Sequence, residues 1–280
     1  MSSTGETELP GSRGFDRTPR HSYQTYLKVP ELLKLQELLA SPPREDELQF
    51  IVVHQTYELW FRLVLATLES VRGAMLAGRL DDAEDGLRRV HAIERVLTQQ
   101  IHVLETMTPA SFLEFRDHLR PASGFQSVQF REIEVLSGLR DAAFVEGLRK
   151  EEVPEVHEAL DRRLAEPSLR EAMHAMLAAR GFDVGWSEPA RTVDDARLDA
   201  ALLSIYKAHS PRDVYRVLEA LIEHDELFRL WRVHHVTMVE RIIGSMPGTG
   251  GSSGAAYLRS TTSHRFYPEL WRVRGALGEG

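Results

Sequence analysis

Apolar side chains recur at spacings of three and four residues along most of this chain, a pattern that restricts it to helices. The clearest run covers residues 45–76 and places Phe50, Tyr57 and Phe61 on one side of a long helix. No clear alternation of period two lies between turn residues, so strands are not expected. We therefore predict an all-α helical bundle that forms a single domain.

Turn and cap residues divide the rest of the chain. Thr108 and Pro109 predict a helix start, because Thr caps a helix and Pro suits its first position. Ser210 and Asp213 predict a capping box. Residues 138–195 are more polar and broken, so we expect short helices and loops on the outside of the bundle. The other expected elements are extended chain at 22–28 and helices at 29–39, 81–105, 109–120, 123–136 and 211–243.

Composition excludes several partners. The chain has 280 residues and a formal net charge of −8, which argues against a nucleic-acid partner. No apolar run reaches the roughly 18 residues of a membrane span. Residues 1–20 hold no apolar segment that could act as a secretory signal. We expect a disordered N-terminal tail at 1–20, one domain at 21–280, and a cytoplasmic location.

The chain contains no cysteine. Disulfides, iron–sulfur clusters, thiolate-ligated haem and covalent attachment of haem through a CxxCH motif are therefore excluded. Any metal must be held by His, Asp, Glu or main-chain atoms.

Two histidines lie on apolar faces of different long helices. His235 falls within the apolar arc of residues 227–244, where it could be an axial ligand of haem or a core histidine with satisfied nitrogens. His54 lies in another apolar run and could face the same cavity. Glu58, one turn later, could form a metal pair with His54 or a simple helical contact.

Two further features could hold a polar ligand. Arg116 lies among apolar residues, where its guanidinium could bind a carboxylate ligand or form a structural salt bridge. The loop Gly248–Gly254 combines glycines with the hydroxyls of Thr249, Ser252 and Ser253. Such stretches are often flexible linkers. Because this one joins two apolar segments, we predict a functional loop.

Several segments of the chain resemble the tryptophan 2,3-dioxygenase family, and they follow one another in the order typical of that family. The resemblance runs from about Ser22 to Arg274 and is most specific in Ser123–Ser127 (SGFQS) and in the glycine–serine loop fourteen residues after His235. The other matching segments are Phe50–Trp60 (FIVVHQTYELW), Phe115–Asp117 (FRD), Leu230–Arg232 (LWR) and Tyr267–Leu270 (YPEL).

The resemblance implies a helical homotetramer with one non-covalent haem b in each subunit, active as Fe(II). His235 matches the proximal iron ligand, and His54 matches the distal histidine that hydrogen-bonds the indole N–H of the substrate. Arg116 matches the residue that clamps the substrate carboxylate, and Thr249 matches the contact to its ammonium and carboxylate groups.

The same resemblance implies the remaining pocket positions. Tyr23, Tyr26 and Leu27 match N-terminal residues that are exchanged between subunits and complete a neighbour's pocket. Phe112 stands where some members carry Tyr, and His234 where some carry Arg. The other expected substrate-pocket residues are Phe50, Ser123 and Gly250.

The implied activity is haem-dependent cleavage of the indole ring of L-tryptophan by O2, giving N-formyl-L-kynurenine, the first step of tryptophan degradation by the kynurenine route. A related haem monooxygenase that acts on tryptophan or a substituted tryptophan and gives a 2-oxindole is the nearest alternative. A haem-binding sensor and a cofactor-free helical interaction protein are more distant ones.

Overall fold

The computed structural model of the chain describes residues 22–150, 153–250 and 253–278. These residues form thirteen α-helices and two 3-10 helices, and their only β pairing is a single bridge between Ser187 and Thr192. The prediction of an all-α fold is thus confirmed for them. The chain divides into two compact units, Met1–Leu38 and Leu39–Gly280. The predicted tail at 1–20 lies outside the described residues.

The first unit contains two short helices, α1 (Tyr23–Leu27) and α2 (Val29–Leu32). Helix α1 begins with a capping box, in which Ser22 Oγ accepts the Thr25 N–H and Thr25 Oγ1 accepts the Ser22 N–H. The prediction of extended chain at 22–28 is therefore wrong, because local capping is enough to start a turn of helix.

The predicted helix at 29–39 is also too long, since α2 ends at Leu32. Leu33 and Leu35 beyond it are 70% and 60% exposed, and none of residues 22–38 is buried. A helix of this length is stable only when an apolar face packs against something. No such packing is found in the described part of this unit.

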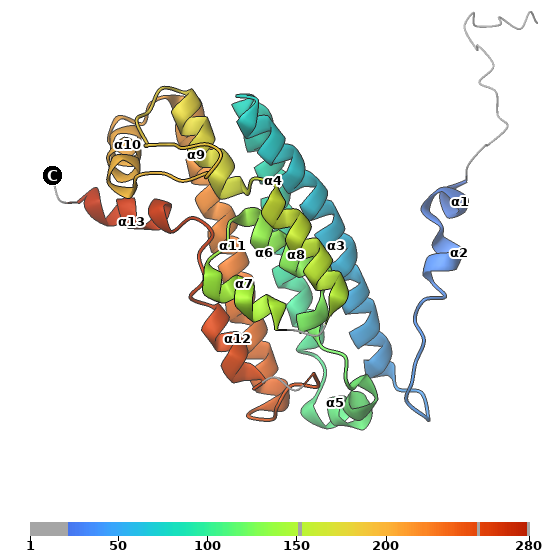
Figure 1. Cartoon of the computed structure of the whole chain (residues 1–280). Coiled ribbons are helices and arrows are strands. Elements are labelled where there is room, and N and C mark those ends of the chain that lie inside the picture. The colour runs from blue at the N-terminus through green and yellow to red at the C-terminus, as the bar shows by residue number, and fades with distance from the viewer. Residues whose placement is uncertain (1–21, 151–152, 251–252, 279–280) are drawn as a thin grey trace, which may run out of the picture. The chain divides into compact units, whose positions relative to one another are not determined.

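Three long helices form the frame of the second unit (Figure 1). Helices α3 (Glu45–Leu76) and α4 (Leu80–Leu104) form a hairpin, joined by a turn in which Gly78 adopts a positive φ of 72°. Helix α11 (Arg212–Ile243) packs against α4. The predicted bounds of these helices are confirmed to within one residue at each end.

The apolar periodicity of α4 explains this arrangement. Ala83, Leu87, Val90 and Ile101 are completely buried, while the exposed face carries charged residues. Burying one such large aliphatic side chain contributes roughly 1.5–3 kcal/mol. A single helix with apolar contacts to both α3 and α11 therefore holds the frame together.

Shorter helices surround the frame. Helix α9 (Leu169–Ala179) packs against α3, with Leu169 and Met173 completely buried, so the prediction that the middle third lies outside the bundle is wrong for this helix. The remaining helices are α5 (Pro109–Arg116), η1 (Asp117–Leu119), η2 (Gly124–Gln126), α6 (Val128–Ser137), α7 (Ala142–Arg149), α8 (Pro154–Ala165), α10 (Asp195–Ala208), α12 (Ala255–Thr261) and α13 (Pro268–Ala276).

The helix caps correct two details. Thr108 caps α5 as predicted, accepting the Ser111 N–H. Helix α6, however, is capped by Ser127 and not opened by Ser123, which precedes a 3-10 turn. The predicted capping box at Ser210 is wrong as well, because Asp213 is instead paired with Arg180 at 2.6 Å.

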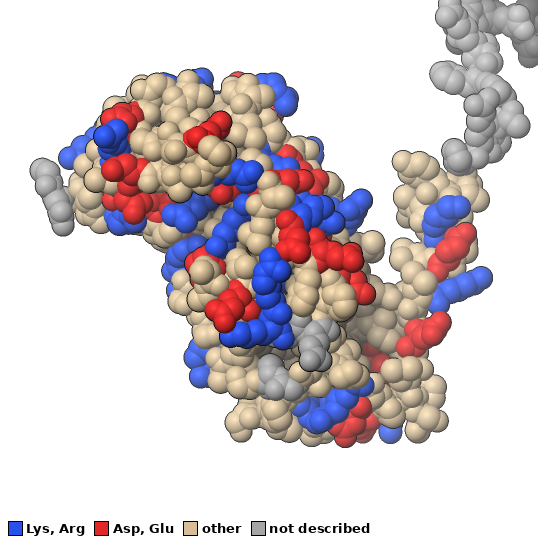
Figure 2. Space-filling view, in the orientation of Figure 1, with Lys and Arg blue, Asp and Glu red and all other residues tan. Residues whose placement is uncertain are grey.

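The surface of the second unit mixes both charges. Lys and Arg side chains are interspersed with Asp and Glu on the face drawn in Figure 2. No helix in the described ranges is both long enough and apolar enough to cross a membrane.

Glu269 joins α13 to α9 through a buried ionic contact. Its carboxylate accepts hydrogen bonds from His174 Nε2 at 2.8 Å and from Arg170 Nε at 3.0 Å. Burial by itself would raise the pKa of Glu269, but these two partners outweigh it and lower the pKa to about 2. The carboxylate is therefore ionised in the folded protein at every ordinary pH.

We predict that Glu269→Gln destabilises the protein at pH 7 by about 3 kcal/mol, the equivalent of a folded-state pKa near 2 against an ordinary value of 4.5. Because folding lowers this pKa, the stabilisation is complete above about pH 4.5 and is lost as the pH falls towards 2.

Urea denaturation at pH 7 and pH 3 measures the effect, with exposed Glu226→Gln on α11 as the control. The control should change stability by no more than about 0.5 kcal/mol. If Glu269→Gln lowered the free energy of unfolding equally at both pH values, Glu269 would not be an ionised carboxylate with a lowered pKa.

Candidate active site

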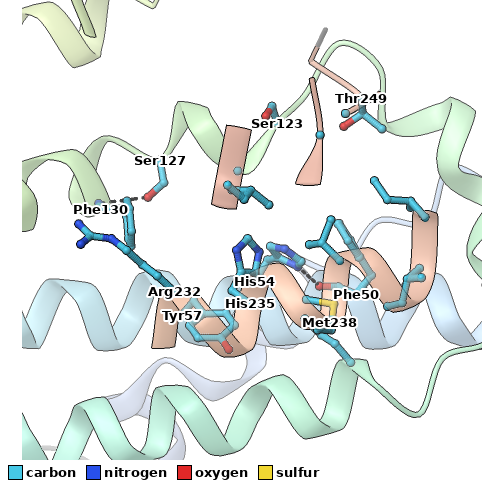
Figure 3. Close-up of a pocket in the computed structure, with 18 of the residues that line it drawn as sticks. Phe50, His54, Tyr57, Ser123, Ser127, Phe130, Arg232, His235, Met238 and Thr249 are labelled. Atoms are coloured by element: carbon cyan, nitrogen blue, oxygen red, sulfur yellow. Dashed lines mark hydrogen bonds between the residues drawn. The ribbon is translucent and has the colours of Figure 1, made fainter. Parts of the chain in front are cut away.

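A cavity of about 270 Å³ lies in the second unit. Its wall is largely apolar, with a few polar groups pointing inward (Figure 3). Seven predicted site residues line it: Phe50, His54, Phe112, Arg116, Ser123, His235 and Thr249. The fold therefore brings together residues that are up to 199 positions apart in the sequence.

His54 enters the cavity from α3. Its Nδ1 lies 2.7 Å from the carbonyl oxygen of Phe50, one turn earlier. Because a carbonyl only accepts hydrogen bonds, Nδ1 carries the proton, and Nε2 of the neutral ring is left as an acceptor. Burial lowers the pKa of His54, with partial opposition from the Phe50 bond and from Glu58. The neutral form is therefore favoured.

His235 projects from α11 into the same cavity, beside His54 in Figure 3. Burial, reinforced by the proximity of His54, lowers the pKa of His235 to about 4. The ring is only half-buried, since part of it faces the cavity. A neutral imidazole with an open nitrogen is a suitable axial ligand for a metal.

Arg116, at the end of α5, is a buried cation with few partners. Only 6% of it is exposed, its Nη2 donates to the carbonyl of Pro247, and its Nε has no hydrogen-bond partner among the described residues. No carboxylate of the described residues forms an ion pair with it. An unpaired buried charge is costly. The structural salt bridge considered for Arg116 is thus not found, and an anionic ligand would satisfy the guanidinium.

The glycine-rich loop packs on the segment that precedes α6. Thr249 Oγ1 donates to the carbonyl of Ala122 at 2.7 Å. A Cβ on Gly250 would lie 2.5 Å from Ser123 Cβ, so only glycine allows this approach. Gly250 supports the loop and does not line the cavity. Gly251 and Ser252 lie outside the described residues.

The N-terminal site candidates belong to the other unit. Tyr23, Tyr26 and Leu27 lie on α1, where they are 73%, 73% and 46% exposed. Their predicted contribution to a neighbouring subunit's pocket stays a prediction.

Glu58 has different partners from those considered for it. Its two carboxylate oxygens accept hydrogen bonds from Ser127 Oγ at 2.6 Å and Gln129 Nε2 at 2.8 Å. The residues that the structure describes include no cluster of three or more His, Cys, Asp or Glu side chains that could hold a metal ion. Glu58 therefore ties α3 to the start of α6, and the proposed metal pair with His54 is not supported.

A buried ionic group in the cavity wall was not predicted. Glu134 lies between Arg131 Nη1 at 2.6 Å and Arg232 Nη2 at 2.7 Å. Burial would raise the pKa of Glu134, but the two guanidinium groups outweigh it and lower the pKa. The group keeps one net positive charge, and Nε and Nη1 of Arg232 have no hydrogen-bond partner in the part of the chain that the structure describes. The one feature of the sequence that could have predicted this group is the spacing of three residues between Arg131 and Glu134 on an apolar helix.

We predict that Gly250→Ala loosens the loop, since the new Cβ would overlap Ser123, whose own Cβ cannot swing away. An overlap of this kind costs about 1–3 kcal/mol. The fraction of molecules in which the loop has detached from Ser123 should therefore rise about fivefold or more. Cleavage of the loop by a broad-specificity protease, under conditions where the protein stays folded, measures that population.

Gly275→Ala in α13 is the matched control, because a Cβ there meets no atom within 4 Å. It should leave the cleavage rate unchanged. A rate for Gly250→Ala equal to that of the control would contradict the close packing of the two segments.

Comparison with known proteins agrees with this geometry. The profile of the tryptophan 2,3-dioxygenase family matches residues 10–158 and 142–277. A tryptophan 2,3-dioxygenase of Nocardioides sp. is 51% identical over 264 residues, covering 91% of this chain and 94% of the relative.

Two other proteins of that name are more distant. The Herpetosiphon aurantiacus protein is 41% identical, with 91% of this chain and 98% of the relative covered. The Pseudomonas aeruginosa protein is 38% identical, with 98% and 95% covered. The two histidines, the arginine and the loop thus occur together in a chain that belongs to the tryptophan 2,3-dioxygenase family.

Proposed function

We propose that this chain uses haem and O2 to open the indole ring of L-tryptophan, giving N-formyl-L-kynurenine as the first step of tryptophan degradation. The observation that carries the proposal is Arg116, a buried cation without a carboxylate partner in the described chain, which lines the same cavity as two neutral histidines. A ligand with a carboxylate and an apolar ring matches this cavity, and membership of the family identifies that ligand as tryptophan.

The cavity suits a non-covalent haem b. His235 would hold the haem iron, because its neutral ring faces the cavity and has no hydrogen-bond partner among the described residues. Arg131 and Arg232, with their net positive charge, would face the haem carboxylates. When bound, ferrous haem iron supplies the centre at which O2 reacts.

The substrate's three chemical parts have separate partners in the wall. Arg116 would form two parallel hydrogen bonds with the carboxylate. Thr249 would exchange its bond to the Ala122 carbonyl for a contact to the ammonium and carboxylate groups. Phe50 and Phe112, whose ring centroids are 6.1 Å apart, would pack on the indole ring.

His54 would orient the indole. Its Nε2 is the acceptor left free by the Nδ1–H bond to Phe50, and an indole N–H can only donate. The resulting hydrogen bond would present the C2–C3 bond of the indole for cleavage. Both atoms of O2 enter the product, one at each carbon, so no further reductant is consumed.

The N-terminal unit supports an oligomer. Tyr23, Tyr26 and Leu33 are at least 70% exposed, and no residue from 22 to 38 is buried. A segment with so much exposed apolar surface is expected to be covered by a partner. We propose a homotetramer in which this segment completes the pocket of a neighbouring subunit.

Product analysis tests the function. The reduced, haem-loaded protein is incubated in air with L-tryptophan, and the product is identified by mass. We expect a gain of two oxygen atoms with ring opening, and no turnover of tryptamine, which lacks the carboxylate that Arg116 would bind. A gain of one oxygen would instead assign the chain to a monooxygenase. The absence of any product would overturn the proposal.

We predict that His235→Ala abolishes stoichiometric haem binding, because no other ligating side chain in the described wall occupies its position. His234→Ala is the matched control, since His234 packs against His102 at a ring distance of 6.0 Å and does not line the cavity. Absorption spectra after haem titration measure both. Full haem retention by His235→Ala would contradict the assignment.

A further inference from the structure

The two cavity histidines are held in different ways. His54 is fixed by the hydrogen bond from Nδ1 to the carbonyl one turn earlier. For His235, neither ring nitrogen has a hydrogen-bond partner among the residues that the structure describes. A histidine that binds metal almost always donates its second N–H to a partner, which fixes the plane of the ring. Another contact must therefore hold this imidazole.

Trp231 provides that contact. It lies four residues before His235 on α11, so the two side chains share one face of the helix. Their ring centroids are 5.0 Å apart and their planes differ by only 8°. A parallel offset pair of this kind restricts rotation of the smaller ring about its Cβ–Cγ bond.

The indole of Trp231 is itself held from three sides. Tyr57 of α3 meets it edge-on at 6.0 Å and 77°, Phe130 of α6 lies at 5.3 Å, and Phe228 lies at 6.2 Å. Tyr57 is in turn anchored by its hydroxyl, which donates to the Leu97 carbonyl of α4 at 2.8 Å. The orientation of Trp231 is thus determined by the frame of the bundle and not by α11 alone.

We propose that Trp231 is the positioning residue of His235, setting the plane of its imidazole by parallel stacking in place of a hydrogen bond. The proposal rests on the proposed function, since it takes His235 as the axial haem ligand. Trp231 acts through His235 and touches no reacting atom in this scheme.

This role predicts a spectroscopic change as well as a loss of affinity. Without the indole face, the imidazole can rotate, so the bond from His235 to iron should become heterogeneous. Loss of one aromatic pair typically weakens binding about two- to twelvefold, so we expect the affinity for haem to fall by a factor in that range.

Three variants separate the ring face from apolar volume. Trp231→Phe keeps an aromatic ring four residues before His235, and Trp231→Leu keeps apolar volume without a ring. Trp60→Leu makes the same change on α3, where Trp60 is half-buried and does not line the cavity. Haem affinity is measured by titration, and the ligand bond by electron paramagnetic resonance of the ferric form and the iron–histidine vibration of the ferrous form. Circular dichroism checks the fold of each variant.

We expect Trp231→Leu to broaden both spectra and weaken haem binding, while Trp231→Phe and Trp60→Leu stay close to the parent. Unchanged spectra in Trp231→Leu, or equal broadening in all three variants, would overturn the proposal. If Trp231→Leu loses its helical signal, Trp231→Met takes its place under the same criteria.

His235→Gly with added imidazole separates this proposal from the assignment of His235. If the iron–histidine vibration survives His235→Gly without imidazole, the assigned ligand is wrong. If imidazole restores haem binding equally well with Trp231 or Leu at position 231, His235 keeps its role and the positioning proposal fails. We expect imidazole to bind about two- to twelvefold more weakly beside Leu.

Discussion

Helix α4 packs against both α3 and α11, and that burial determines where the two cavity histidines can lie. The contact is apolar along most of its length, but two buried hydrogen bonds fix its register. Glu94 on α4 bonds His224 on α11 at 2.7 Å, and His91 Nε2 lies 2.9 Å from the Ala220 carbonyl. Because a helix slides along an apolar surface more easily than it breaks buried polar bonds, these contacts specify one position of α11. His235 lies three turns beyond His224 on the same rigid helix.

Burial then sets the chemistry of the cavity. Burial keeps His54 and His235 neutral, and the same cavity contains Arg116, a buried cation without a carboxylate partner in the described residues. A neutral base accepts a proton or a metal, and an unpaired guanidinium attracts an anion. The apolar wall strengthens both effects, because electrostatic interactions are weakly screened there. Residues of ordinary type thus become a specific site through their surroundings.

Much of this arrangement could be predicted from the sequence. The periodicity of residues 45–76 and 211–243 identified long helices, and His54, His235 and Arg116 stood out as polar groups on apolar faces. Local capping was less predictable, since Ser22 and Ser127 each begin a helix that the pattern assigned differently. The buried group of Arg131, Glu134 and Arg232 was missed. Its members are ordinary charged residues until the fold brings Glu134 against a guanidinium 98 residues away.

The sequence alone determined that the chain is helical, that any metal must be held without thiolates, and that His54, His235 and Arg116 lie on apolar stretches of their helices. These properties depend on residue type and on spacing along one helix, both of which are local. Only the tertiary structure decided that α3, α5 and α11 place their polar groups in one cavity, and that Tyr57 of α3 and Phe130 of α6 pack on the ring of Trp231, which stacks on His235. Such contacts depend on packing between segments far apart in the chain, which no local pattern specifies.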